Sequence, residues 1–94
     1  MRERLIVDQK QLDLYVSRRC WSCWRTRRLL AHHAFRFEVI DVSDDAHLRS
    51  WLSDFTGRTT LPYIFVDYRP VGGFEEIRVL ERLGQLDHVV RGEV

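Results

Sequence analysis

The sequence predicts an α/β fold with a four-stranded mixed β-sheet flanked by three helices, in the order β-α-β-α-β-β-α. Three observations lead to this prediction. Apolar runs of strand length recur along the chain, helix-length amphipathic segments separate the first three runs, and a tight turn joins the last two. A helical crossover makes the first two strands parallel with a right-handed connection, whereas the turn makes the last two antiparallel.

Composition predicts one globular domain over residues 1–94, with its core at about 12–90. Hydrophobic residues make up 45% of the chain and charged residues 31%, which is typical of a folded protein. The net charge of +1 argues against a general nucleic-acid binder. No apolar run has the length of a membrane span and the start of the chain lacks the apolar region of a signal peptide, so we expect no membrane partner and a cytoplasmic location.

The first half of the chain reads as strand, helix, strand. Residues 12–16 alternate and then become apolar, which indicates a strand, and Leu5-Ile6-Val7 could add another short one. Nothing interrupts a helix from Trp21 to about His33. A second strand is predicted from Phe35 to its end at Asp41. The predicted helix carries an apolar stripe made of Trp24, Leu29, Leu30 and Ala34.

The second half begins with a capping signal at Ser43-Asp44-Asp45, and Gly57 suits the end of the helix that follows. A strand at 63–66, a turn at 67–70 and a short strand from Val71 come next. A last helix is predicted at 74–83, after which Leu86, Val89 and Val90 dock a C-terminal tail. Trp51 and Phe74 are predicted core residues.

The only two cysteines form the motif Cys20-Trp21-Ser22-Cys23 at the predicted start of a helix. Backbone N–H groups and the positive end of the helix dipole stabilise a thiolate there, and helix-start thiols can have a pKa lowered to roughly 3.5–7.5. A second thiol one turn later can resolve a mixed disulfide formed by the first. The motif therefore predicts thiol–disulfide chemistry.

Zinc binding is the alternative use of such a pair, because a zinc site normally needs four ligands. Only His32 and His33 could complete a set with the cysteines. Adjacent helical residues point about 100° apart, so we interpret both histidines as exposed polar residues at a helix end and expect no metal site.

Two further blocks accompany the cysteine motif and the strand residue Tyr15 before it. They are Gly57-Arg58-Thr59-Thr60-Leu61-Pro62-Tyr63-Ile64-Phe65-Val66-Asp67 and Val71-Gly72-Gly73-Phe74-Glu75-Glu76. In this order and spacing they resemble the glutaredoxins, which have the thioredoxin fold, and Gly84-Gln85-Leu86-Asp87 is similar to a common glutaredoxin ending.

The resemblance implies a glutathione-dependent oxidoreductase that reduces protein disulfides and glutathione mixed disulfides. Cys20 is the implied nucleophile and Cys23 the resolving thiol, with glutathione and disulfide-containing or glutathionylated proteins as partners of a monomer. It also implies a cis bond at Pro62 against the cysteine motif. The implied glutathione-binding residues are Arg58 at the glycine carboxylate, Leu61 through its backbone, Glu76 and then Glu75 at the γ-glutamyl ammonium, and Thr60, Pro62, Gly73 and Trp21.

Two positions depart from the family pattern. Trp21-Ser22 replaces the usual Pro-Tyr, and Ser17 stands where a Lys is common, so Arg18 or Arg19 would have to supply the positive charge. Some glutaredoxins without the motif proline hold a [2Fe–2S] cluster between two protomers through Cys20-type thiolates and two glutathiones, which makes a cluster carrier one alternative. A thioredoxin-like reductase fed by a flavoenzyme is the other.

Overall fold

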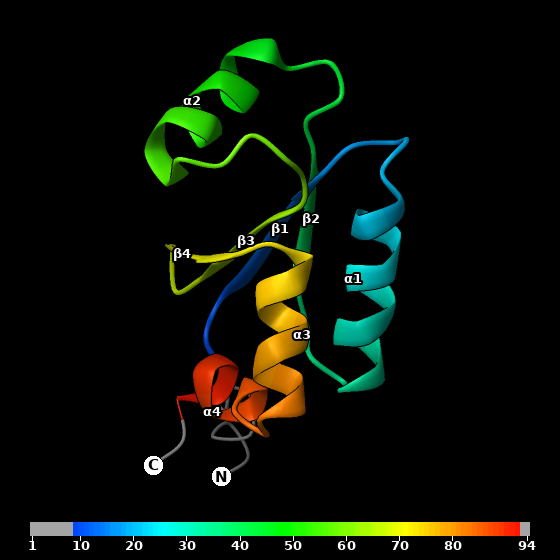
Figure 1. Ribbon diagram of the computed structural model, residues 1–94, viewed down its shortest axis with the longest axis vertical. Helices are drawn as coiled ribbons and strands as arrows, with labels where there is room; N and C mark the ends of the chain where they lie inside the picture. Colours follow the sequence, from blue (N-terminus) through cyan, green and yellow to red (C-terminus); the bar gives the residue numbers. More distant parts are fainter. Residues whose placement is uncertain (1–8, 93–94) are drawn as a thin grey trace, which may run out of the picture.

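The computed structural model describes residues 9–92, and the predicted segment Leu5-Ile6-Val7 lies outside them. The elements run in the order β1 (Leu12–Val16), α1 (Trp21–His32), β2 (Glu38–Asp41), α2 (Ala46–Thr56), β3 (Tyr63–Val66), β4 (Arg69–Gly72), α3 (Phe74–Arg82) and α4 (Leu86–Arg91). Figure 1 shows α1 and α3 beside each other on one side of the sheet, and α2 lies apart from them on its other side, at the top of the view.

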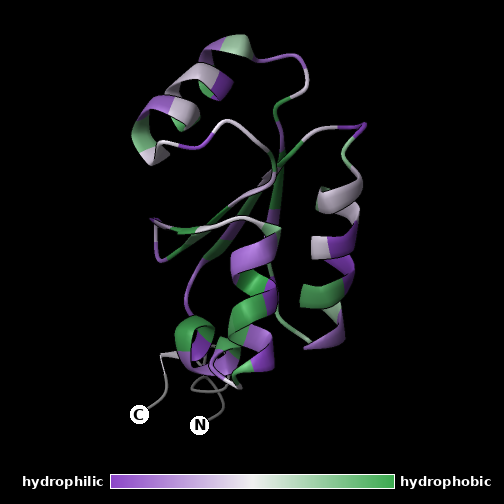
Figure 2. Cartoon of the chain, in the orientation of Figure 1, coloured by the Kyte–Doolittle hydropathy of each residue, from purple (hydrophilic) through white to green (hydrophobic). Residues whose placement is uncertain are grey.

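The four strands form one mixed sheet in the spatial order β2-β1-β3-β4. β1 is parallel to β2 and antiparallel to β3, and β3 is antiparallel to β4. These pairings confirm the predicted fold class. The central strands β1 and β3 therefore carry the core, and Figure 2 shows hydrophobic residues concentrated along the strands.

Alternation along the two central strands divides the core between the faces of the sheet. Leu14 and Ile64 pack with Leu30 of α1 and Ile77 of α3 on one face. On the other face the buried residues are Val42, Leu52, Tyr63 and Phe65, so α2 covers that side through Leu52. A helix layer on each face leaves the motif that begins α1 at one end of the sheet.

The second strand is shorter than predicted. It begins at Glu38, whereas Phe35 is buried without belonging to a strand. Ala34 adopts a positive φ of 62° directly after α1, so the chain reverses there and inserts the Phe35 ring into the core before any sheet pairing begins. Phe35 is therefore apolar because its ring is buried in the core, and not because it belongs to a strand.

The C-terminal segment is a fourth helix, α4, where a docked tail was expected. Leu86 and Val90, four residues apart, are both buried, which is the spacing of one helix face. Asp45 caps α2 as predicted, accepting a hydrogen bond from the Leu48 N–H at 3.0 Å. Within residues 9–92, no helix combines the length and apolarity needed to cross a membrane.

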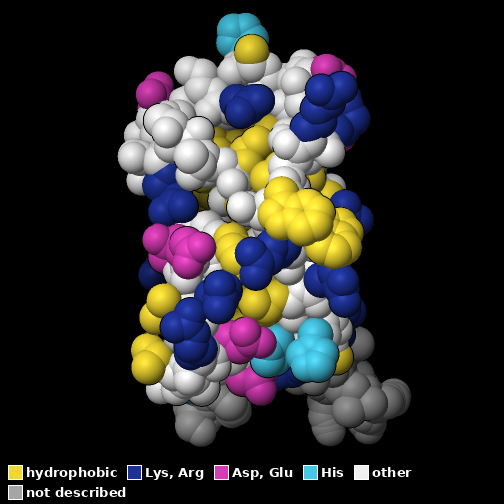
Figure 3. All heavy atoms as spheres, turned by 45° about the vertical axis from the view of Figure 1, so that its right-hand side comes forward, with side chains coloured by type: hydrophobic (Ala, Val, Ile, Leu, Met, Phe, Trp, Pro, Cys, Tyr) yellow, Lys and Arg dark blue, Asp and Glu magenta, His cyan; other side chains and the backbone are white. Residues whose placement is uncertain are grey.

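Several aromatic side chains remain at the surface. Phe74 is buried as expected, at 7% exposure, but Trp51 is 50% exposed, so its prediction as a core residue is wrong. Trp51 instead stacks on Phe55 along the outer side of α2. Trp24 is 46% exposed, and Figure 3 shows hydrophobic side chains protruding between Lys and Arg side chains on one face.

Candidate active site

Cys20 occupies the N-cap of α1, directly after the turn that leaves β1. Its backbone is extended, with φ of −124°, and its Sγ accepts a hydrogen bond from the Cys23 N–H at 3.0 Å. An N-cap acceptor satisfies one of the backbone donors that a helix start leaves free. The sulfur therefore lies where a helix start favours negative charge.

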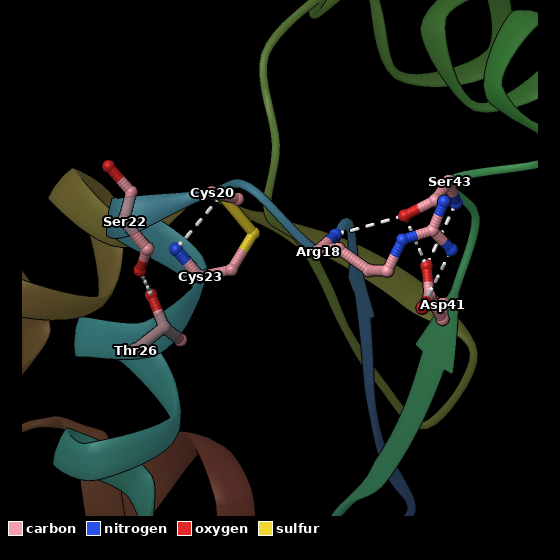
Figure 4. The surroundings of a disulfide bond; sticks show 7 residues. All are labelled: Arg18, Cys20, Ser22, Cys23, Thr26, Asp41 and Ser43. Atoms are coloured by element: carbon pink, nitrogen blue, oxygen red, sulfur yellow. Dashed lines mark hydrogen bonds and ion pairs between the residues drawn. A yellow bond between two sulfur atoms is a disulfide. The ribbon is translucent and has the colours of Figure 1, made fainter.

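The two cysteines are joined by a disulfide, with Cα atoms 5.1 Å apart, so the structure describes the oxidised form. Their exposure differs, because Cys20 is half-buried whereas Cys23 is only 2% exposed and belongs to the core. The first turn of α1 is also held from below by the buried Thr26, whose hydroxyl donates to the Ser22 carbonyl at 2.7 Å (Figure 4). The arrangement makes Cys20 the accessible sulfur of the pair.

The Arg18 guanidinium is paired with acidic residues and does not supply its positive charge to the Cys20 sulfur. Its guanidinium lies 3.2 Å from an Asp44 carboxylate oxygen and 3.9 Å from one of Asp41, and its backbone N–H donates to Ser43. The hydrogen bond and charge of Asp44 raise the pKa of Arg18, and the Ser43 hydroxyl is the main cause of a lowered pKa of Asp41. Figure 4 shows the Arg18 side chain extending from the disulfide toward Asp41. Of the two predicted charges, Arg19 is the one that has no ion pair with an acid of the described part of the chain, residues 9–92.

The Leu61–Pro62 peptide bond is cis, as the resemblance implied. Pro62 is buried immediately before β3, where a proline removes no needed ladder donor. Leu61 is half-buried and packs against both core clusters, including the one that contains Cys23. Thr60 is exposed in the loop before it.

A charged cluster lies beyond this loop. Glu76 accepts a hydrogen bond from the Gly73 N–H at 2.8 Å, and its other oxygen lies 3.2 Å from Nη1 of Arg58. The Gly73 hydrogen bond is the main reason that the pKa of Glu76 is lowered, and the charge of Arg58 adds to it. This Glu76 contact with the N-cap backbone makes the predicted acid also part of the helix start of α3.

Gly73 brings three segments together. A Cβ on this residue would lie 2.5 Å from Nη2 of Arg58 and 3.2 Å from the Pro62 carbonyl oxygen. Arg58 Nε is buried and has no hydrogen-bond partner among the described residues. A glycine is therefore needed for the Arg58 side chain to pass so close to the start of α3.

The predicted site residues fall into two groups. Arg58, Gly73 and Glu76 meet in the charged cluster, and Arg58 and Glu76 line a cavity of about 330 Å³. Cys20 and Trp21 line a separate cavity of about 430 Å³. Glu75 is exposed and makes no contact with Arg58 in the described hydrogen-bond network, so Glu76 is the acid that joins the cluster.

Three residues near the site were not singled out from the sequence. Tyr63 donates its hydroxyl to the Arg58 carbonyl at 2.6 Å, and Thr56 accepts from the Arg58 N–H at 3.2 Å, which together hold the backbone of Arg58. Trp24 stacks on Trp21 with ring centroids 4.9 Å apart. The spacing of three residues between the two tryptophans is the signal that places them on one helix face.

The histidines do not approach the cysteines. They lie at the other end of α1, where His33 Nε2 is 2.7 Å from a Glu81 oxygen and its ring stacks on Phe35. His32 is exposed as expected, but His33 is half-buried. Among residues 9–92 no three Cys, His, Asp or Glu side chains gather as metal ligands.

Comparison with known proteins gives one consistent result. The family model described as Glutaredoxin matches residues 12–71. A glutaredoxin of Pseudomonas aeruginosa is 34% identical over 74 residues, which span 79% of this chain and 88% of that protein.

Solved structures agree with this match. The solution structure of glutaredoxin from Brucella melitensis superposes with a TM-score of 0.81 at 32% identity, covering 93% of this chain and 96% of the other. A buckwheat glutaredoxin–glutathione complex has the same fold, with a TM-score of 0.76 at 22% identity over 88% of this chain and 77% of the other.

Proposed function

Because this chain belongs to the glutaredoxin family and is a thiol–disulfide oxidoreductase, we propose that it uses glutathione to reduce protein disulfides and glutathione mixed disulfides. The position of Cys20 at the N-cap of α1 is the observation that supports this most strongly, because the Cys23 N–H already points at its sulfur. After reduction, the same hydrogen bond stabilises the Cys20 thiolate.

With a glutathionylated protein the reaction begins at Cys20. Its thiolate attacks the glutathione sulfur, a Cys20–glutathione disulfide forms, and the protein leaves as a thiolate that takes a proton from water. A second glutathione thiolate then attacks the mixed disulfide, which releases Cys20 and forms glutathione disulfide. In the net exchange the protein sulfur is reduced from disulfide to thiol, the incoming glutathione is oxidised from thiol to disulfide, and the glutathione moiety taken from the substrate stays at the disulfide level.

With a protein disulfide both cysteines act. The Cys20 thiolate forms a mixed disulfide with one protein sulfur and releases the other, and Cys23 then attacks Cys20 and releases the protein dithiol. The product is the Cys20–Cys23 disulfide that the structure contains. Two glutathiones return it to the dithiol and leave as glutathione disulfide.

We propose that glutathione binds on the surface between the Cys20–Cys23 disulfide and the charged cluster of Arg58, Gly73 and Glu76. Its peptide part pairs with the Leu61 backbone, and its terminal charges meet Arg58 and Glu76. The remaining proposed binding residues are Thr60, Pro62, Gly73, Glu75 and Trp21. In the free protein Arg58 and Glu76 are paired with each other at 3.2 Å, so the carboxylate and ammonium of the ligand replace one internal ion pair with two external ones. Both side chains are partly exposed, which keeps the cost of this exchange small.

Substitution of both cysteines separately tests the assignment. We expect Cys20→Ser to lose reduction of glutathione mixed disulfides by more than about a hundredfold, because its hydroxyl is not a thiolate. Cys23→Ser is the matched control, and we expect it to keep that reaction while losing most reduction of protein disulfides. Activity that survives in Cys20→Ser would exclude Cys20 as the nucleophile.

The electron donor is tested by a coupled assay on the wild-type chain. We expect turnover with glutathione and glutathione reductase, and little with thioredoxin and its flavoenzyme reductase. The reverse preference would favour the thioredoxin-like alternative and leave the dithiol chemistry intact.

The Trp21-Ser22 pair in place of Pro-Tyr sustains a second candidate function, a [2Fe–2S] cluster held by Cys20 of two protomers with two glutathiones. We propose the reductase as a monomer in the cytoplasm. Visible absorption, iron and a dimer after anaerobic purification would favour the cluster carrier instead.

A further inference from the structure

The segment around the dithiol concentrates positive charge. Residues 17–28 contain five arginines and no acidic residue, although the whole chain has a net charge of only +1. The remaining residues therefore carry a net negative charge. Such an asymmetry creates a local positive potential at the end of the molecule that carries Cys20.

Most of these arginines are not neutralised. Arg18 is paired with Asp44 and Asp41. Within residues 9–92 no salt bridge involves the four others, which are Arg19, Arg25, Arg27 and Arg28. All four side chains are exposed and remain available to an external anion.

Two tryptophans lie among these charges. Trp21 is 70% exposed, its ring stacks on Trp24 at 4.9 Å, and the Arg28 guanidinium lies 5.0 Å from the Trp24 ring centre. Exposed stacked indoles flanked by arginines are typical of interaction surfaces, where both residue types are enriched. We call this surface the Trp–Arg face; it consists of Arg19, Trp21, Trp24, Arg25, Arg27 and Arg28.

Four residues of the Trp–Arg face line cavities next to Cys20. A cavity of about 430 Å³ contains Arg19, Trp21 and Trp24 together with Cys20. A second cavity, of about 200 Å³, is lined by Arg27, Trp24 and both cysteines, and also by Asp41 and the Arg18 with which it is paired. Trp24 and Cys20 thus line both cavities. Figure 3 shows that hydrophobic side chains protrude between Lys and Arg side chains on one face of the molecule.

We propose that the Trp–Arg face docks disulfide-bearing protein partners whose cysteine is flanked by acidic residues. The partner carboxylates bind the free arginines, and an apolar residue beside its cysteine packs on Trp21. This inference rests on the proposed function, since it names the partner class for the same sulfur. A nucleic acid offers the same negative charge but no disulfide for Cys20, and the low net charge of the chain disfavours it further.

The test compares three synthetic peptides, each carrying one cysteine as a glutathione mixed disulfide and flanked by acidic, neutral or basic residues. At low ionic strength we expect kcat/KM for the acidic peptide to exceed that for the basic one by about tenfold or more, with the ratio approaching one as salt is added. Equal rates at low salt overturn the proposal.

Charge-reversal variants test whether the preference for the acidic peptide comes from the Trp–Arg face. We expect the double substitution Arg25→Glu with Arg28→Glu, at two residues that line neither cavity of Cys20, to remove the preference for the acidic peptide at low salt. Reduction of hydroxyethyl disulfide by glutathione, measured at high salt where the charges are screened, should stay unchanged. Arg49→Glu reverses an exposed charge on α2 and is the matched control, which should keep the preference. A preference that survives the double substitution, or that Arg49→Glu removes equally, contradicts docking on this face.

A binding measurement separates this proposal from the redox chemistry. The Cys20→Ser protein is titrated with the acidic peptide carrying Ser in place of its cysteine, and chemical shifts of the indole N–H groups are followed by NMR. We expect changes at Trp21 and Trp24 and none at Trp51. Absence of binding overturns the docking proposal even where turnover is normal, and failure of turnover with binding retained overturns only the proposed function. Equal binding of a single-stranded oligonucleotide would overturn the choice of a protein partner.

Discussion

The two halves of the candidate site are held in different ways. The sulfur half, Cys20 and Cys23, lies within the first turn of one helix, and its geometry depends on the 3.0 Å hydrogen bond from Cys23 to Cys20. The charged half, Arg58, Gly73 and Glu76, joins the loop after α2 to the start of α3. Reactivity can therefore be set locally by helix geometry, whereas the proposed glutathione binding would depend on the packing of distant segments. Substitutions should be able to alter one half without the other.

The largest effect on the charged half is expected from Gly72→Ala. Gly72 has a φ of 139°, and a Cβ there would lie 2.7 Å from Cγ of Glu76. We expect the free energy of unfolding to fall by about 1–3 kcal/mol, because a side chain strains this backbone conformation and displaces Glu76. Chemical denaturation measures the loss.

Gly84→Ala is the matched control for that substitution. Gly84 also has a positive φ, of 71°, but a Cβ there meets no atom within 4 Å. We expect a smaller loss, of about 1 kcal/mol, from backbone conformation alone. Equal losses at the two positions would mean that the Glu76 contact does not matter. The rate of Cys20 alkylation in the reduced protein should change in neither variant.

An intermediate effect is expected from Arg58→Ala. Loss of a charged hydrogen-bonding partner should raise KM for glutathione by about tenfold, with kcat changed much less. The rate of Cys20 alkylation by iodoacetamide should stay the same, since Arg58 has no contact with the sulfur half. Arg58→Gln, which retains hydrogen-bond donors, should recover part of the affinity. A change in alkylation rate would show that the two halves are coupled.

The smallest effect concerns acid stability. The pKa of Glu76 is lowered in the folded protein, chiefly by the Gly73 N–H, so the folded state favours the ionised carboxylate. Its stabilising contribution is present above the ordinary pKa of glutamate and is lost as the pH falls through the lowered folded value. We expect the difference in stability between wild type and Glu76→Gln to be greatest near neutral pH and to shrink on acidification. Denaturation curves at several pH values measure it, and a constant difference would contradict the assignment.

The sequence predicts the central strands well because their alternation reflects burial on two faces. The strands at 12–16 and 63–66 have the predicted bounds. The sequence pattern predicts the wrong structure at Phe35, because this residue is buried without belonging to a strand. It predicts the wrong burial at Trp51, because this residue packs on the exposed Phe55 and not in the core. In α4 the buried residues Leu86 and Val90 have the four-residue spacing of a helix face. The segment is only six residues long, and the sequence pattern therefore predicted a docked tail and not a helix.

The candidate site divides in the same manner. The helix-start position of Cys20 follows from local sequence, since the motif comes directly after a strand and nothing interrupts the helix behind it. The pairing of Arg58 with Glu76 does not, because these residues are eighteen positions apart and meet only after α3 has packed. The ion pair between Arg18 and Asp44 likewise cannot be predicted from local sequence, because it depends on where the loop before α2 lies.

The C-terminal helix has a practical consequence for handling the protein. The Lys10 N–H donates to the Val90 carbonyl at 2.8 Å, so both ends of the described chain meet, and Figure 1 shows them at the pole away from the start of α1. A linker to an electrode or resin attached at the Lys10 side chain would therefore hold the protein by the end opposite its dithiol. A circular permutant that joins the end of α4 directly to Lys10 would need only a short connecting loop, because these two described segments already meet.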